Sequence, residues 1–220
     1  MKTMFIWVET LYRLGFYNVL INAVYRLKLK SGLINKLTPV KGSIEGVLFS
    51  VFDTDTSIKK VSEEIVELTL LNADLLCEGR CRFFFYEETF IGSPPKWFQH
   101  DEGGFKGHWS KSPVNRVVNQ DIKVTWDLSR FHWAQVLSCA YSISGEPKYL
   151  DTLNDWFIDW NSSNPVNSGV NWACGQECAT RVIHVLNSIK ILENVSINSN
   201  SLVCFVLEHA KRIEPTISYA

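Results

Sequence analysis

From Trp126 to the end of the chain, apolar residues recur at the three-to-four-residue spacing of amphipathic helices. The pattern is interrupted at Gly145-Glu146-Pro147 and again between Asn164-Pro165 and Gly169. Glycine ends helices and proline begins them, so helices are expected to start near residues 126, 146, 172 and 200. Short connections make successive helices antiparallel. We therefore predict a mainly α fold, an incomplete (α/α) toroid of antiparallel helical hairpins, with a short extended segment and a long aromatic loop.

Each of these helices presents an apolar stripe that we predict to face the core. The stripes are Trp133, Leu137, Ala140 and Tyr141; Tyr149, Leu153, Trp156 and Trp160; Cys178, Val182, Val185 and Ile189; and Leu202, Phe205, Val206, His209 and Ile213. Ser199 or Ser201 is expected to cap the last helix. The chain has 8 Trp, and a tryptophan face suits either a large core or a sugar ring. For any single one we favour the core.

Two further helical patterns lie in the first half of the chain. Residues 4–30 predict one or two helices that end at Ser31-Gly32. A strong helix is expected over residues 57–76, capped by Thr56 or Ser57. The apolar residues that recur on one face of that helix are Ile65, Leu68 and Leu71.

Two segments, residues 44–52 and 81–86, favour extended structure. Residues 87–121 then form a long irregular stretch, and its aromatic density argues against disorder. We predict an ordered flap there that lays Trp and His side chains over the helical body. The regions 1–40, 41–125 and 126–220 are expected to make one continuous domain: a helical extension, a helix with an extended segment and the aromatic loop, and a hairpin portion truncated at its C-terminal end.

Composition is that of a globular protein, with 46% hydrophobic and 20% charged residues. The net charge of −1 gives no bulk attraction for nucleic acid, so a binder of acidic sugars would need local positive charge. The N-terminal segment contains no run long enough for a membrane span, and it is a poor signal peptide. Two alternatives stay open for this segment: a helix packed on the body, which we favour, or a basic amphipathic helix on a membrane surface.

The cysteines allow two interpretations. Cys77 and Cys81, like Cys174 and Cys178, are four residues apart, which places both thiols of each pair on one helix face. Such pairs suit a disulfide or a metal, but the flanking spacing of common zinc sites is lacking. We expect small buried core residues, no metal and no cofactor.

Four motifs in the second half of the chain occur in a distinctive order. They are Trp126-Asp127-Leu128-Ser129-Arg130-Phe131; Ala140-Tyr141 with Gly145-Glu146-Pro147-Lys148-Tyr149; Trp160 with Asn164-Pro165 and Gly169-Val170-Asn171-Trp172; and Glu177 with Arg181. Together they resemble the N-terminal helical region of the heparinase II/III-like polysaccharide lyases. The resemblance covers about the last half of the chain, and a weaker resemblance extends into the aromatic stretch before it.

The resemblance implies an (α/α) toroid followed by a β-sandwich, and β-elimination on uronate polysaccharides such as heparan sulfate or alginate. In that reaction Asn or His binds the uronate carboxylate, Tyr or His removes the C5 proton, and a Tyr protonates the leaving oxygen. The family's Asn-His segment is expected beyond Ala220, and the chain has no Asn-His dipeptide. We therefore expect no catalytic residue here and an inactive chain on its own. The implied partners are an acidic polysaccharide and the missing C-terminal portion, in the periplasm or cell envelope.

Six residues are candidate substrate contacts: Arg130, His132, Asn171, Trp172, Glu177 and Arg181. Arginine is suited to carboxylate and sulfate because its planar fork makes two parallel hydrogen bonds. Glu177 and Arg181 are spaced to pair on one helix face, so a purely structural ion pair is the alternative for them. Asn171 and Trp172 are expected at a helix N-terminus, where backbone N–H groups favour anions.

The remaining histidines and carboxylates leave other hypotheses open. His100 and His108 in the aromatic stretch are weaker candidates for substrate contact, and His184 and His209 are expected to be structural. Asp127 and Glu177 would be the acid/base pair of an α/α-toroid glycoside hydrolase. A non-catalytic helical module that binds carbohydrate or protein is a further alternative.

Overall fold

The chain is mainly helical in the computed structural model, which describes residues 9, 12–13, 15–50, 62–82, 88–98, 105–112, 122–192 and 195–217. The helices are α2 (Phe16–Lys30), α3 (Leu33–Leu37), α4 (Glu63–Cys77), α5 (Ile122–Leu128), α6 (His132–Ser144), α7 (Pro147–Ser163), α8 (Gly175–Ile191) and α9 (Ser199–Ile213). Single 3-10 turns are η2 (Trp109–Lys111), η3 (Val170–Trp172) and η4 (Glu214–Thr216). Within these ranges, no helix is both long and apolar enough to cross a bilayer.

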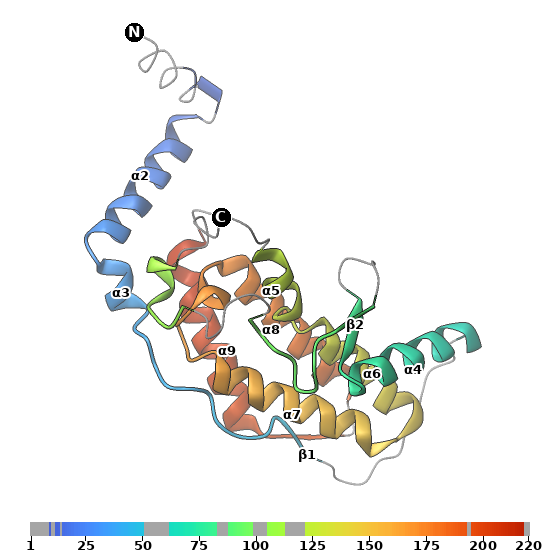
Figure 1. Cartoon of the computed structure of the whole chain (residues 1–220). Coiled ribbons are helices and arrows are strands. Elements are labelled where there is room, and N and C mark those ends of the chain that lie inside the picture. The colour runs from blue at the N-terminus through green and yellow to red at the C-terminus, as the bar shows by residue number, and fades with distance from the viewer. Residues whose placement is uncertain are drawn as a thin grey trace.

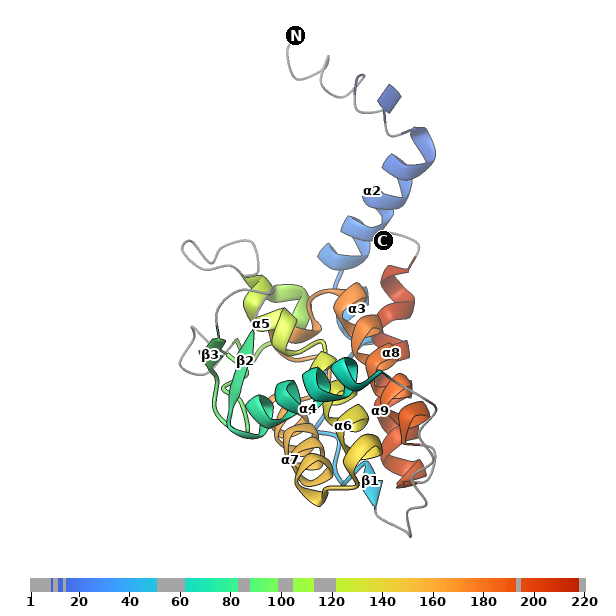
Figure 2. The same cartoon turned by 90° about the vertical axis from the view of Figure 1, so that its right-hand side faces the viewer.

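Helix α6 occupies the middle of the body, because α4, α7 and α8 each pack against it and α9 packs against α8 (Figures 1 and 2). Two short antiparallel strand pairs are present, one between distant parts of the chain and one between neighbouring segments. Strand β1 (Phe49–Ser50) pairs with β4 (Ser196–Ile197), just before α9. Strand β2 (Arg80–Arg82) pairs with β3 (Glu88–Phe90) at the end of α4. The predicted extended segments are therefore confirmed at residues 49–50 and 81–82, while residues 83–86 lie outside the described ranges.

The turn between α6 and α7 follows directly from its sequence. Gly145 has φ 70°, a left-handed conformation that glycine adopts without strain, and its N–H donates to the carbonyl of Tyr141 at 2.8 Å. Pro147 then begins α7, where its missing N–H costs no helical hydrogen bond. This hairpin is confirmed, and all four residues of the predicted α7 stripe are buried.

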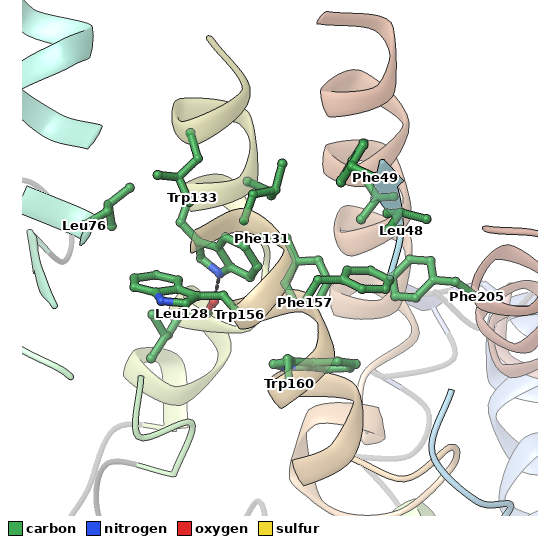
Figure 3. Packing of buried hydrophobic residues seen from close by; sticks show 14 of the residues in the cluster. Leu48, Phe49, Leu76, Leu128, Phe131, Trp133, Trp156, Phe157, Trp160 and Phe205 are labelled. Atoms are coloured by element: carbon green, nitrogen blue, oxygen red, sulfur yellow. Dashed lines mark hydrogen bonds between the residues drawn. The ribbon is translucent and has the colours of Figure 1, made fainter. Parts of the chain in front are cut away.

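Phe131 is the centre of an aromatic core (Figure 3). Its ring centroid lies 4.9 Å from that of Trp160 and 5.0 Å from that of Trp133, and it stacks on Phe205 of α9 at 6.0 Å. The residue has φ 67°, which is uncommon outside glycine and turns the chain sharply between α5 and α6. The expected single helix from Trp126 is thus two helices, because Phe131 leaves the helical conformation to fill the core.

The aromatic flap is present in the described residues 88–98 and 105–112, where Trp97 and Trp109 are buried against the helical body. The indole of Trp97 donates to a carboxylate oxygen of Asp159 on α7 at 2.6 Å. Trp109 donates to the hydroxyl of Thr38, just after α3. His100 lies outside the described residues.

Three helix boundaries differ from expectation. Helix α4 begins at Glu63 because Ser62 is extended and the acidic Glu63 and Glu64 favour a helix N-terminus; Thr56 and Ser57 lie outside the described ranges. Helix α8 begins at Gly175, because the preceding residues form the 3-10 turn η3. The cap of α9 is Asn198, whose side chain accepts from the N–H of Ser201.

The apolar face of α4 is also differently placed. Ile65, Leu68 and Leu71 are each more than half exposed, whereas the buried residues of α4 are Ala73 and Leu76. The i, i+3, i+6 spacing does place these three residues on one face of α4. Helix α6 packs against a different face, the one that carries Ala73 and Leu76. Side-chain periodicity fixes which residues share a face and not which face is covered.

Truncation of Phe131 is expected to cost more stability than any loss at the surface. Phe131→Ala should lower the free energy of unfolding by about 3–5 kcal/mol, because it removes a fully buried ring and leaves a cavity. Chemical denaturation monitored by circular dichroism measures this. Phe90→Ala, on a side chain that is 74% exposed, is the matched control and should change stability by about 0.5 kcal/mol or less. Equal effects of the two substitutions would contradict the packing.

Candidate functional site

Arg130 joins the turn after α5 to the first turn of α8. Its Nε and Nη2 donate to the two carboxylate oxygens of Glu177 at 2.7 and 2.8 Å, and its Nη1 donates to Asp127 at 3.1 Å. Hydrogen bonding to Glu177 raises the pKa of Arg130. The expected partner of Glu177 was Arg181, and that expectation is wrong. Glu177 instead makes a bidentate ion pair with Arg130, whose side chain is partly exposed.

Two histidines adjoin this ion pair. The ring of His184 on α8 donates from Nδ1 to the carbonyl of Arg130 at 2.6 Å. The exposed His132 on α6 lies edge-on to it, with ring centroids 6.0 Å apart. Burial lowers the pKa of His184, so its ring is neutral near pH 7. We call these five residues the Arg130 face: Asp127, Arg130, His132, Glu177 and His184.

Arg181 lies beneath this face and is fully buried. Its Nη2 donates to the carbonyl of Asn171 at 2.7 Å, and its Nε donates to Nε2 of His209 at 3.2 Å. Further contacts reach the carbonyl of Ser129 at 3.4 Å and the thiol of Cys178 at 3.2 Å. The guanidinium also lies 4.8 Å from the ring centroid of Trp160. Arg181 thus binds the turns on both sides of it and has no exposed atom to offer a ligand.

A second buried arginine lies one helix away. Arg212 of α9 donates from Nε to the carbonyl of Trp172 at 2.7 Å and from Nη2 to the carbonyl of Ala173 at 2.8 Å. Its guanidinium stacks 3.5 Å from the ring centroid of Trp109. Together with Arg181 it holds three consecutive carbonyls of the turn after Val170. We call Asn171, Trp172, Arg181, His209 and Arg212 the buried arginine cluster.

The buried arginine cluster carries positive charge without a paired carboxylate among the described residues. Burial lowers the pKa of both arginines, yet a guanidinium stays protonated in proteins. Burial also holds the pKa of His209 well below its ordinary value, so that ring is neutral. Two cations in a low-dielectric interior project a positive potential to the nearest surface.

A surface pocket of about 210 Å³ adjoins the cluster. Its walls come from α2, η2, α5 and the residue after η3, and they consist of Tyr25, Leu29, Trp109, Ser110, Ser112, Trp126 and Ala173. Trp109 separates the pocket from the guanidinium of Arg212, and Ala173 presents the carbonyl that Arg212 binds. The hydroxyl of Ser112 is buried and has no hydrogen-bond partner among the described residues. The pocket therefore combines aromatic walls with a nearby cation.

The comparison with protein families gives one match. The family described as heparinase II/III N-terminus matches residues 51–217. The chain belongs to this family. Comparison with curated proteins and with solved structures returned no match. The resemblance drawn from the four motifs is confirmed, and the match extends it through α4 and the aromatic flap.

The six predicted contacts of this heparinase II/III N-terminal domain fall into two sets. Arg130, His132 and Glu177 meet on the Arg130 face, while Asn171, Trp172 and Arg181 lie in the buried arginine cluster. The two sets are adjacent, because the carbonyl of Ser129 binds Arg181 and the next residue is Arg130. His184 and His209 were expected to be structural, and His209 is fully buried.

Arg212 is the residue that sequence reasoning missed. A charged residue in a last helical turn ordinarily faces solvent. The available signal was its spacing, since Arg212 lies three residues after His209 and seven after Phe205, on the buried face of α9. Asn171 and Trp172 were expected at the N-terminus of α8 but lie in η3 before it, with both side chains buried.

The cysteines of the domain are free thiols. Cys178 is buried as expected, whereas Cys204 is exposed, contrary to the core interpretation. Burial raises the pKa of Cys81 to about 11. No group of three or more His, Cys, Asp or Glu side chains suited to a metal ion occurs in the part of the chain that the structure describes.

Replacement of Arg181 separates a structural role from direct substrate contact. Arg181→Lys should lower the free energy of unfolding by about 2–4 kcal/mol, because an ammonium cannot reach the same set of acceptors. Thermal and chemical denaturation measure the loss. Arg82→Lys, in an exposed ion pair with Glu88, is the control and should change stability by less than about 1 kcal/mol. Unchanged stability with lost polysaccharide binding would instead make Arg181 a direct contact.

The neutral His209 should make the domain acid-sensitive. Below pH ~6.5 the unfolded chain takes up a proton that the folded chain excludes, so stability is full above that pH and falls below it. His209→Gln should reduce the loss of unfolding free energy between pH ~7.5 and ~5.5 by about 1 kcal/mol. Denaturant titrations at the two pH values measure this. The unaltered protein measured alongside is the reference, and an equal loss of stability in both proteins would refute the assignment.

Proposed function

We propose that this chain is the N-terminal helical part of a polysaccharide lyase that cleaves uronate-containing glycans by β-elimination. Membership of the heparinase II/III N-terminus family over residues 51–217 carries the proposal. The antiparallel hairpin α6–α7 and the packing of α8 on α6 and α9 support a portion of an (α/α) toroid. In this proposal the helices form one wall of the substrate cleft.

The chemistry of β-elimination divides between binding and proton transfer. A lyase must neutralise the uronate carboxylate, remove the C5 proton and protonate the glycosidic oxygen. We assign to this chain only sugar binding, because it holds no Asn-His dipeptide and no residue that matches the family's catalytic tyrosine segment. Turnover then requires groups that these residues do not supply.

The aromatic pocket is the best candidate for an acidic sugar. A flat sugar ring can pack on the indole faces of Trp109 and Trp126 that line the pocket. Arg212 behind Trp109 supplies positive potential. Lys111, which is exposed and lies between two pocket residues, adds a surface cation. These features supply the local positive charge that a chain of net charge −1 needs for this role.

The Arg130 face is the candidate for contacts with neighbouring sugar hydroxyls. Two carboxylates already surround Arg130, so a uronate carboxylate would be repelled there, but its remaining N–H groups can donate to neutral oxygens. Trp126 of the pocket directly precedes Asp127 of this face. We therefore propose that Arg130 and His132 contact sugar, and that Glu177, Asn171, Trp172 and Arg181 lie behind them as positioning residues.

The glycoside hydrolase alternative is weaker on this geometry. Its acid and base would be Asp127 and Glu177, yet both bind the same guanidinium, and both oxygens of Glu177 are occupied. A glycosidase needs one of the two carboxyl groups to meet the glycosidic oxygen. The alternative of a non-catalytic binding module would use the same pocket to bind sugar. It differs from our proposal only in whether the whole protein is a lyase.

Polysaccharide binding by the intact chain tests the proposal. The chain should bind alginate or heparan sulfate, with affinity that falls as salt increases, and should bind a neutral glucan weakly. It should release no unsaturated uronate product, which ultraviolet absorbance detects. Lys111→Gln should weaken binding about threefold to tenfold by removing a cation near the pocket, measured by calorimetry.

A matched cation away from the pocket provides the control. Lys211→Gln on α9, whose side chain is similarly exposed and pairs with Glu208, should leave the affinity unchanged. Failure to bind any uronate polymer would overturn the substrate assignment. Turnover by the chain alone would overturn the assignment of proton transfer to other groups.

A further inference from the structure

Helix α2 exposes an apolar stripe that the rest of the domain leaves uncovered. Phe16, Leu20 and Leu27 recur on one side of the helix and are 72%, 48% and 65% exposed. Val24 and Tyr17 flank them and are also exposed. None of the residues of α2 is buried, and the helix projects away from the body (Figure 1). The packing on the body that we favoured from the sequence holds only for one side of α2, where Leu29 packs against the core and lines the pocket with Tyr25.

Asn18 and Asn22 lie on the side of α2 away from Phe16, whereas the cations border the apolar stripe. Arg26 and Lys30 follow one edge of it, since Lys30 lies three residues after Leu27. Lys28 adds a cation in the last turn. A short helix with aromatic and aliphatic residues on one face and Lys/Arg along the edges of that face can lie in a membrane interface, where the long basic side chains reach the headgroups.

Charge is unevenly distributed along the chain, and the segment that contains α2 is basic. Residues 10–43 contain six Lys or Arg and no Asp or Glu, although the whole chain has 22 cations against 23 anions. The remaining sequence is therefore acidic. A basic segment on an acidic body orients the molecule at a negative surface, because the segment is attracted and the body is repelled.

Helix α2 also lies outside the region that defines the family. The family match begins at residue 51, and α2 ends at Lys30. The helix thus lies outside the helical body that the family match covers, and its exposed stripe takes no part in that body's core. We propose that α2 docks this protein on an anionic lipid bilayer, with Phe16, Leu20 and Leu27 in the interface and its cations at the headgroups.

The same observations disfavour the other occupants. A second copy would bring two basic segments together, and their like charges oppose association. An acidic polysaccharide would match the cations, but a bare aliphatic stripe offers it no hydrogen-bonding group. With 15 residues, α2 is too short to cross a bilayer, so in-plane binding is the arrangement that its length allows.

Co-sedimentation of the full chain with vesicles tests the proposal. The protein should bind vesicles of phosphatidylcholine mixed with phosphatidylglycerol, and it should bind pure phosphatidylcholine weakly. Leu20→Gln with Leu27→Gln should reduce partitioning at least about tenfold, because two apolar side chains leave the interface. Arg26→Gln with Lys30→Gln should reduce binding to the anionic vesicles about fivefold per cation, with little effect on neutral ones.

The exposed face of α4 provides a matched control. Leu68→Gln with Leu71→Gln changes two leucines that are each 54% exposed and should leave vesicle binding unchanged. Circular dichroism should show that all variants keep the fold, because every altered side chain lies at the surface. Equal binding to both vesicle types, or equal loss in the α2 and α4 variants, would overturn the proposal. The proposal would also be overturned if the protein formed a dimer, or bound polysaccharide, and only the α2 leucine variant abolished that association.

Discussion

The turn from Val170 to Ala173 is held by two buried guanidinium groups, and the remainder of the body is arranged around that contact. Arg181 comes from α8 and Arg212 from α9, so the carbonyls of Asn171, Trp172 and Ala173 tie both helices to the end of the preceding hairpin. Through Ser129 the same arginine reaches the turn between α5 and α6. Buried arginines are costly unless their donors are satisfied, which here requires the turn to keep its shape.

That structural solution has an electrostatic consequence for binding. Carbonyl dipoles and aromatic rings, rather than hydrogen-bonded carboxylates, surround the two guanidinium groups. Their positive charge is therefore only partly offset, by Glu177 one turn from Arg181. A surface cation would lose most of its field to water and salt, whereas a cation behind Trp109 keeps it. Arg130 shows the opposite arrangement, with two carboxylates around one guanidinium. The two neighbouring surfaces are therefore suited to different parts of a glycan.

The elements that sequence predicts best are those with local causes. Gly145 and Pro147 set the hairpin between α6 and α7 through backbone conformation alone, and the stripe from Tyr149 to Trp160 follows from helical periodicity. The split at Phe131 was not predictable in this way, because only contacts with Trp160 and Phe205, distant in the chain, stabilise its left-handed backbone.

The candidate site follows the same division. Helical spacing paired Glu177 with Arg181, whereas Glu177 makes its bidentate contact with Arg130 from another segment, which an i, i+4 relation within one helix does not reveal. Arg212 was not predicted as part of the buried cluster, because a charged residue is ordinarily expected at the solvent-exposed surface. The exposed apolar stripes of α2 and α4 show a second limit of sequence analysis. The sequence predicts that a helix has an apolar face, but it does not predict what covers that face.

The central claim is that the aromatic pocket above the buried arginine cluster receives an acidic sugar. Titration of the isotope-labelled chain with a uronate oligosaccharide, followed by NMR of the tryptophan indole N–H groups, tests it most directly. The account predicts that the signals of Trp109 and Trp126 shift, while those of Trp156 and Trp160 in the aromatic core stay in place. Shifts confined to other tryptophans, or no shift with a uronate ligand, would contradict it.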